Sequence, residues 1–185
     1  MIQLLTLHDR LFAWIETTIA PVLMPSLARF VFAAVFLVYF WNSALTKLGG
    51  SITGLVSPSF NAFAQIFPKG AEAAGYDIAQ ATLFQKLVIL SGTWAEFILP
   101  ALIVLGLLTR LAALGMIGFV IVQSLTDLFG HNAIADGKTL GAWFDGAPDS
   151  IILDQRALWI VLLAVLVMRG AGPLSLDRLI RARLT

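Results

Sequence analysis

Four apolar stretches, each about as long as a lipid bilayer is thick, constrain the fold of this chain most. They run over residues 27–46, 87–109, 111–129 and 151–169. A helix needs about 20 apolar residues to cross the hydrocarbon core of a membrane. Only 12% of the residues are charged, against about 25% in a soluble domain, and the mean hydropathy is +0.90. The sequence therefore predicts an all-α membrane protein, folded as a four-transmembrane-helix bundle.

The segments between and beyond these crossings predict two outer loops and two amphipathic ends. The loops cover residues 49–84 and 130–150, and no internal repeat or second domain interrupts 1–185. Residues 1–25 are apolar but are interrupted by charges and by Pro21 and Pro25, which is typical of a helix that lies in the membrane interface. At the other end, Gly and Pro residues at 170–173 break the last crossing, and Ser175 can cap a short amphipathic helix.

The distribution of positive charge predicts the orientation. Arg110 lies between the second and third crossings, and Arg169 begins an arginine-rich tail. The loop 130–150 carries three aspartates against one lysine. Because loops rich in Lys and Arg stay in the cytoplasm, both termini are expected there and both long loops outside.

Several classes of chemistry are not expected within this chain. It contains no cysteine, and its two histidines, His8 and His131, lie at opposite ends of the predicted layout. Iron–sulfur clusters, bis-histidine haem and a metal site are therefore not expected. The net charge of +1 and the absence of a basic stripe give no indication of nucleic-acid binding. Redox chemistry would need a diffusible cofactor or another subunit.

Polar side chains fall at similar depths in all four crossings, counted from the cytoplasmic arginines. At a rise of 1.5 Å per residue, one group lies at about 20 Å and a second at about 26 Å. The first comprises Asn42, Glu96, Gln123 and Arg156, and the second Lys47 and Asp127. An ionisable group inside a membrane is costly without a partner. The expected pairs are Glu96 with Arg156 and Asp127 with Lys47.

This polar layer has two interpretations. It either locks the helices together through side-chain contacts, or it binds a polar head such as a quinone ring and relays protons, with Glu96 as the ionisable group. In the second case Trp41 and Trp94 would flank the ring; otherwise they are anchors at the outer interface. His131 is either an ordinary surface group or a site of proton exchange with the outer compartment.

Three stretches carry a resemblance to a known family. They are FLVYFWNSALTKL over residues 36–48, Glu96 followed by LGLLTRL over residues 105–111, and GPLSLD over residues 172–177. In this order the chain resembles the DoxX family of small bacterial membrane proteins. The resemblance implies a four-helix bundle in the bacterial inner membrane and marks Lys47, Glu96 and Arg110. Related members are subunits of thiosulfate:quinone oxidoreductase or of oxidoreductase complexes that deal with oxidative stress.

The leading hypothesis is a membrane subunit of an oxidoreductase complex that binds a quinone-like carrier. Glu96 would handle the head group or its proton, with Arg156 and Lys47 as charge partners and Asn42 and Gln123 as hydrogen bonders. A protein partner holding the redox centre would attach through the outer loops or the cytoplasmic tail. The first alternative is a non-catalytic membrane anchor or assembly partner, and the second is a carrier of a small solute or ion.

Overall fold

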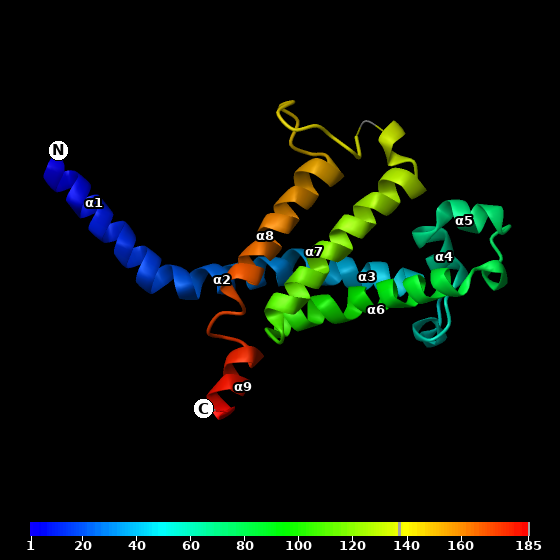
Figure 1. Cartoon of the computed structure of the whole chain (residues 1–185), viewed down its shortest axis with the longest axis horizontal. Coiled ribbons are helices and arrows are strands. Elements are labelled where there is room, and N and C mark those ends of the chain that lie inside the picture. Colours follow the sequence, from blue (N-terminus) through cyan, green and yellow to red (C-terminus); the bar gives the residue numbers. More distant parts are fainter. Residues whose placement is uncertain (137, 185) are drawn as a thin grey trace.

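The structure is a computed structural model in which residues 1–136 and 138–184 are described. Within these ranges four continuous helices are long and apolar enough to cross a membrane, and no β-strand occurs. These helices are Ile2–Lys47, Leu83–Leu105, Thr109–Gly130 and Ile151–Arg169 (Figure 1). The predicted all-α membrane protein with four crossings is confirmed.

The first helix is far longer than the predicted crossing. It consists of α1 (Ile2–Trp14), α2 (Ala20–Phe32) and α3 (Val38–Lys47), joined by π-helical turns at 15–19 and 33–37. At 1.5 Å per residue its 46 residues measure about 69 Å. The interfacial helix expected over 1–25 continues without a break into the first crossing, although Pro21 and Pro25 lie between them. Pro21 lies in the first turn of α2, directly after a π-helical turn, and such positions bend a helix without ending it.

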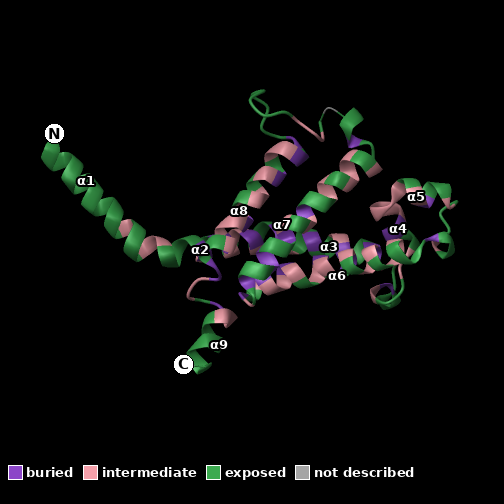
Figure 2. Cartoon of the chain, viewed as in Figure 1, coloured by how far each residue is buried: buried purple, intermediate pink, exposed green. Residues whose placement is uncertain are grey.

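The α1 segment protrudes from the bundle. It bends away from α2 and contains no buried residue (Figures 1 and 2). Its exposed side chains include Ile2, Leu5, Leu11 and Trp14, which leaves a large apolar surface outside the protein core. Such a surface has to contact lipid or another protein.

The second and third crossings form a tight hairpin whose turn differs from the prediction. α6 (Leu83–Leu105) ends at Gly106, which has φ +69°, and α7 (Thr109–Leu125) begins three residues later. The turn therefore lies at 106–108 and not at Thr109 and Arg110. Glycine adopts the left-handed conformation without steric cost, so the helix ends at Gly106 although leucines follow.

The fourth crossing and the tail follow the predicted pattern. A π-helical turn over 151–155 leads into α8 (Arg156–Arg169), and the helix stops at Gly170. The short helix α9 (Leu176–Leu184) follows. Ser175 caps it as predicted, because its Oγ accepts a hydrogen bond from the amide of Arg178 at 3.3 Å.

The predicted outer loop 49–84 is a small helical cap. It contains α4 (Phe60–Ile66), α5 (Pro68–Ala73) and short 3-10 turns at 52–55 and 78–80. A separate apolar cluster holds the cap on the end of α6: Ala62, Phe63, Ala71, Ala81 and Ile89 are all buried. By contrast, most described residues of the loop 130–150 are exposed.

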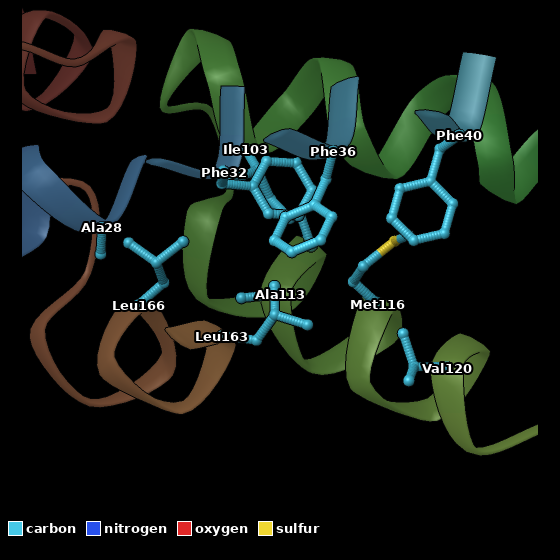
Figure 3. Close-up of a cluster of buried hydrophobic side chains, with 11 residues drawn as sticks. Ala28, Phe32, Phe36, Phe40, Ile103, Ala113, Met116, Val120, Leu163 and Leu166 are labelled. Carbon is cyan, nitrogen blue, oxygen red and sulfur yellow. The ribbon is translucent and has the colours of Figure 1, made fainter. Parts of the chain in front are cut away.

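The main core lies where the four crossings meet. Phe32, Phe36 and Phe40 recur every four residues along the first helix, so they line one face of it. They pack against Met116 of α7 and Leu163 of α8 (Figure 3). This core fixes the relative positions of the helices that carry the polar side chains.

The tail is fastened to the α6–α7 turn. Asp177 accepts hydrogen bonds from the amides of Leu108, at 2.8 Å, and Thr109, at 3.1 Å. Burial alone would raise the pKa of Asp177, but the amide hydrogen bonds from Thr109 and Leu108, together with the nearby charge of Arg181, lower the pKa below its usual value. Asp177 thus supplies the cap that the first turn of α7 lacks from its own sequence.

Arg29 of α2 completes this attachment. Its guanidinium donates to the carbonyls of Ile103 and Ala171, at 3.0 Å each, and to those of Val104 and Leu174. One side chain therefore ties the first crossing to the end of α6 and to the tail.

Candidate functional site

A buried ion pair joins α3 to α6. Nζ of Lys47 lies 3.0 Å from Oε1 and 2.9 Å from Oε2 of Glu96. Only 7% of Lys47 and 1% of Glu96 is exposed. Ser43, one turn before Lys47, accepts from Nζ at 2.9 Å and donates to Oε1 of Glu96 at 2.9 Å. The three side chains thus satisfy one another, and the two charged ones are buried.

A second ion pair joins α7 to α8. The guanidinium of Arg156 lies 2.7 Å from Oδ2 of Asp127 and donates to Oγ of Ser124 at 3.0 Å. The predicted pairs, Glu96 with Arg156 and Asp127 with Lys47, are therefore wrong. Instead, Glu96 pairs with Lys47 and Asp127 pairs with Arg156. Each pair connects neighbouring helices, and neither crosses the bundle.

The two ion pairs lie on opposite sides of an opening in the bundle. α6 and α7 meet at their turn and diverge toward the other end (Figure 1). A cavity of about 520 Å³ lies between them. Its apolar walls include Val88 and Leu99 of α6 and Phe119 and Val122 of α7.

The polar residues of this cavity gather toward its wide end. They are Ser43, Lys47, Gln65, Ser91, Glu96, Gln123, Thr126, Asp127 and His131. His131 Nε2 donates to the carbonyl of Gln65 at 2.9 Å, which links the end of α7 to the helical cap. Gln123 donates to the hydroxyl of Tyr39 at 3.2 Å, while its buried Oε1 has no hydrogen-bond partner among the described residues. A residue that lines the cavity therefore carries an unsatisfied hydrogen-bond acceptor.

The cavity is accessible from the side of the bundle. Gly115, Gly118 and Val122 line it and are exposed on the surface of α7. Because this surface belongs to a membrane-spanning helix, a lipid-soluble molecule could enter from the bilayer without crossing the helical cap. The site thus combines an apolar entrance with a polar interior.

The structure brings together half of the predicted site residues. Glu96, Lys47, Gln123 and Asp127 line the cavity. Asn42, Trp41, Trp94 and Arg156 do not. Asn42 is exposed on the surface of α3, and Arg156 is buried behind Asp127.

Both predicted tryptophans lie away from the cavity. Trp41 donates to the carbonyl of Phe97 at 3.2 Å, and Trp94 donates to that of Leu55 at 2.9 Å. Each is 41% exposed. Their indole N–H groups are satisfied by the backbone, so they contribute to the packing between α3, α6 and the cap.

Sequence reasoning missed Ser43, Gln65 and Thr126. Ser43 had a detectable signal, because it precedes Lys47 by four residues and such pairs share one face of a helix. Gln65 had none, since its position depends on how the cap folds over α6.

The donor set suits an organic molecule better than a metal ion. No group of three or more His, Cys, Asp or Glu side chains suited to a metal ion occurs in the described part of the chain. Instead, the cavity offers an ammonium group, two carboxylates, amides and an imidazole beside apolar walls. These groups can hydrogen-bond carbonyl and hydroxyl oxygens of a flat, apolar ligand.

Comparison with known sequences decides the family. A sequence model of the DoxX family matches residues 24–126, more than half of the chain. The chain belongs to the DoxX family. No curated protein and no solved structure matches it. The matched DoxX region contains Lys47, Glu96 and the cavity walls of α6 and α7, whereas Arg156 and the tail lie beyond it.

The sequence stretches that resemble the DoxX family have two structural roles. Lys47 and Glu96 form the buried ion pair beside the cavity. The LGLLTRL and GPLSLD stretches meet at the other end of the bundle, where Asp177 caps α7. These two stretches hold the helices together, and Arg110 does not line the cavity.

Proposed function

We propose that this DoxX protein is the membrane subunit of an oxidoreductase complex and binds a quinone-like, lipid-soluble carrier in the cavity between α6 and α7. The proposal rests on one observation. A cavity that is open toward the lipid reaches a buried carboxylate–ammonium pair. Its volume of about 520 Å³ lies within the range of about 300–1,000 Å³ that is typical of small-molecule sites.

Different residues of the cavity would bind different parts of the ligand. Lys47 can turn one of its three N–H groups from Oε1 of Glu96 to a ring oxygen, while it stays paired with Glu96 through Oε2. The free Oε1 of Gln123 can accept one from a ring hydroxyl. Apolar side chains of α6 and α7 hold the ring and exclude water. A bound quinone supplies a two-electron, two-proton couple, with the electrons coming from the redox centre of a partner subunit.

Proton exchange is assigned to Glu96 and His131. Glu96 holds or releases a proton at Oε1 or Oε2, and Lys47 stabilises its charged form. His131 lines the same cavity, is exposed, and can exchange a proton with the solvent. Glu96 is the group on which the chemistry depends.

The proposed location is the bacterial inner membrane, with both termini in the cytoplasm. Arg110, Arg169 and the arginines of α9 gather at the end of the bundle opposite the cavity. By the positive-inside rule this end faces the cytoplasm, and the cavity then opens within the outer leaflet.

Mass spectrometry of the gently extracted protein tests the proposal. The wild type should retain a quinone at close to one molecule per chain, and Glu96→Gln should lose most of it. Glu72→Gln is the matched control, because Glu72 is exposed on α5 and outside the cavity. Lipid alone in the wild type, or a quinone that Glu96→Gln does not affect, would contradict the assignment.

The fully exposed α1 favours a second candidate function, a membrane anchor for another protein. A partner helix could cover the apolar side chains that α1 leaves outside the core. In that case deletion of residues 2–14 should abolish capture of the partner, whereas Glu96→Gln should leave it unchanged. The reverse pattern would favour the quinone site.

A further inference from the structure

A cleft rich in arginine lies at the end of the bundle opposite the quinone cavity. It measures about 430 Å³ and lies between the α6–α7 turn, the end of α8 and the tail. Arg110, Arg169, Arg178 and Arg181 all line it, and all four are exposed. Among the described residues that line it, Asp177 is the only acid, so these residues carry a surplus of three positive charges.

The single acid does not neutralise this cleft. Both carboxylate oxygens of Asp177 accept hydrogen bonds from the backbone of the α6–α7 turn. Within the described residues, the side chains of Arg110, Arg169 and Arg178 form no ion pair or hydrogen bond. Guanidinium groups gathered in this way are suited to a ligand with several acceptor oxygens, above all a phosphate.

The backbone makes room for one of the arginines. Gly170 has φ +78°, and a Cβ built on it would lie 3.2 Å from Nε of Arg110. The Arg110 side chain therefore packs against the backbone where α8 ends. Arg110 of α7 thus lies at the end of α8 and lines the same cleft as the arginines of α8 and α9.

The position of the cleft points to a lipid phosphate. α6, α7 and α8 are membrane-spanning helices, and all three have an end at this level, where lipid head groups lie. Leu108 and Leu111 line the same cleft and are 56% and 67% exposed. Arginines beside exposed leucines match a molecule with a phosphate and acyl chains, whereas free phosphate would need no leucines.

We propose that this cleft binds the phosphate of an anionic phospholipid. The arginines hold the phosphate oxygens, and the leucines contact the upper parts of the acyl chains. The bound lipid bridges α7, α8 and α9, and so adds to the attachment of the tail through Asp177. This site is independent of the proposed quinone cavity, because the two lie at opposite ends of the bundle.

Positive charge at this end also serves to orient the protein in the membrane, and a Lys/Arg exchange separates the two roles. Lysine satisfies the positive-inside rule as well as arginine does. It cannot form the two parallel hydrogen bonds by which a guanidinium holds a phosphate. A variant with Arg110→Lys and Arg178→Lys should therefore keep its orientation but lose affinity for the lipid.

The test uses the full-length protein in a mild detergent, stripped of lipid. Native mass spectrometry follows binding of phosphatidylglycerol, of zwitterionic phosphatidylcholine and, by competition, of inorganic phosphate. We expect one phosphatidylglycerol to bind at least about tenfold more tightly than phosphatidylcholine, which corresponds to about 1.4 kcal/mol. The double Lys variant should lose about this factor. The control, Arg10→Lys with Arg183→Lys, changes arginines outside the cleft and should lose nothing.

Three results would overturn the proposal. Equal binding of the two lipids would mean that the cleft does not recognise negative charge. Unchanged affinity in the double Lys variant would place the lipid elsewhere. Inorganic phosphate that competes as strongly as the lipid binds would make the ligand a soluble anion. If the double variant does not fold, as judged by its melting temperature without lipid, Arg169→Lys alone replaces it in the same comparison.

Discussion

Nζ of Lys47 lies 2.9 Å from Oε2 of Glu96, and this contact joins the last turn of α3 to the middle of α6. Both groups are almost completely buried. Removing one partner of a buried ion pair leaves an uncompensated charge, whereas replacing both removes the cost along with the interaction. The same ion pair therefore contributes to the stability of the bundle and belongs to the proposed binding site.

The first prediction concerns which charges are coupled. Lys47→Met should destabilise the bundle by about 3–5 kcal/mol, because Glu96 is left buried without a counter-charge. Adding Glu96→Gln should recover about 2 kcal/mol of this loss, which is the coupling expected for residues in contact. Unfolding measured in mixed micelles provides the free energies of the complete double-mutant cycle.

A second cycle is the control for the first. Glu96→Gln combined with Arg156→Met should show no coupling beyond about 0.5 kcal/mol, because these side chains belong to different ion pairs. A larger coupling between Glu96 and Arg156 than between Glu96 and Lys47 would restore the pairing first expected from the sequence.

The second prediction concerns the attachment of the tail by Asp177. Its pKa is lowered in the folded protein, so its stabilising effect is present above the ordinary value of about 3.9 and is lost as the pH falls through the folded pKa. The amide chemical shifts of Leu108 and Thr109, followed by NMR, should therefore titrate with a midpoint below about 3.9. A midpoint above that value would contradict the hydrogen bonds assigned here.

Asp177→Ala gives the corresponding energy. The variant should lose about 0.5–2 kcal/mol, the usual effect of deleting a helix cap. Asp9→Ala is the control, since Asp9 is exposed on α1 and bonds only its neighbour His8 among the described side chains. Equal melting temperatures for the two variants would count against the cap.

The third prediction concerns Arg29. Its guanidinium reaches four carbonyls on two segments, and the smaller ammonium group of lysine cannot reach all of them. Arg29→Lys should destabilise the protein by about 1.5–3 kcal/mol, the contribution of one hydrogen bond to a charged group. Thermal unfolding measures this loss, and Arg10→Lys on the exposed α1 should show none. An unchanged melting temperature for Arg29→Lys would mean that these contacts contribute nothing.

The crossings were predictable because hydropathy and length alone determine them. Their ends were not, because Gly106 could be recognised as a helix end only from its left-handed φ, in a run of leucines that continues past it. In the loop 49–84, the helical spacing of Phe60, Phe63 and Phe67 predicts a helix that lies on the membrane surface or covers the bundle, but the arrangement of the cap was not predictable. Its short helices are held by contacts with α6 that no local pattern reveals.

The depth of a residue along its helix does not determine which partner it pairs with, as the two ion pairs show. Glu96 and Arg156 were matched because they lie at one depth, but depth says nothing of the direction in which a side chain points. Lys47 lies about 5 Å higher than Glu96 on the helical rise, and its long side chain spans that difference. The direction of the side chain also explains why Asn42 does not line the cavity. Asn42 lies five residues before Lys47 and hence points about 140° around the helix from it.

The most direct test of the central claim is the position of the bound carrier. A photoreactive quinone analogue, activated in membranes that contain the protein, labels the residues it contacts, and peptide mass spectrometry identifies them. We predict labels on residues 88–99 of α6 and on residues 115–127 of the helix Thr109–Gly130. Gly118→Leu, which fills the cavity, should suppress them, and Gly118→Ala should not, since a Cβ there meets no atom within 4 Å. Labels confined to other helices, or labels that Gly118→Leu leaves unchanged, would contradict this prediction.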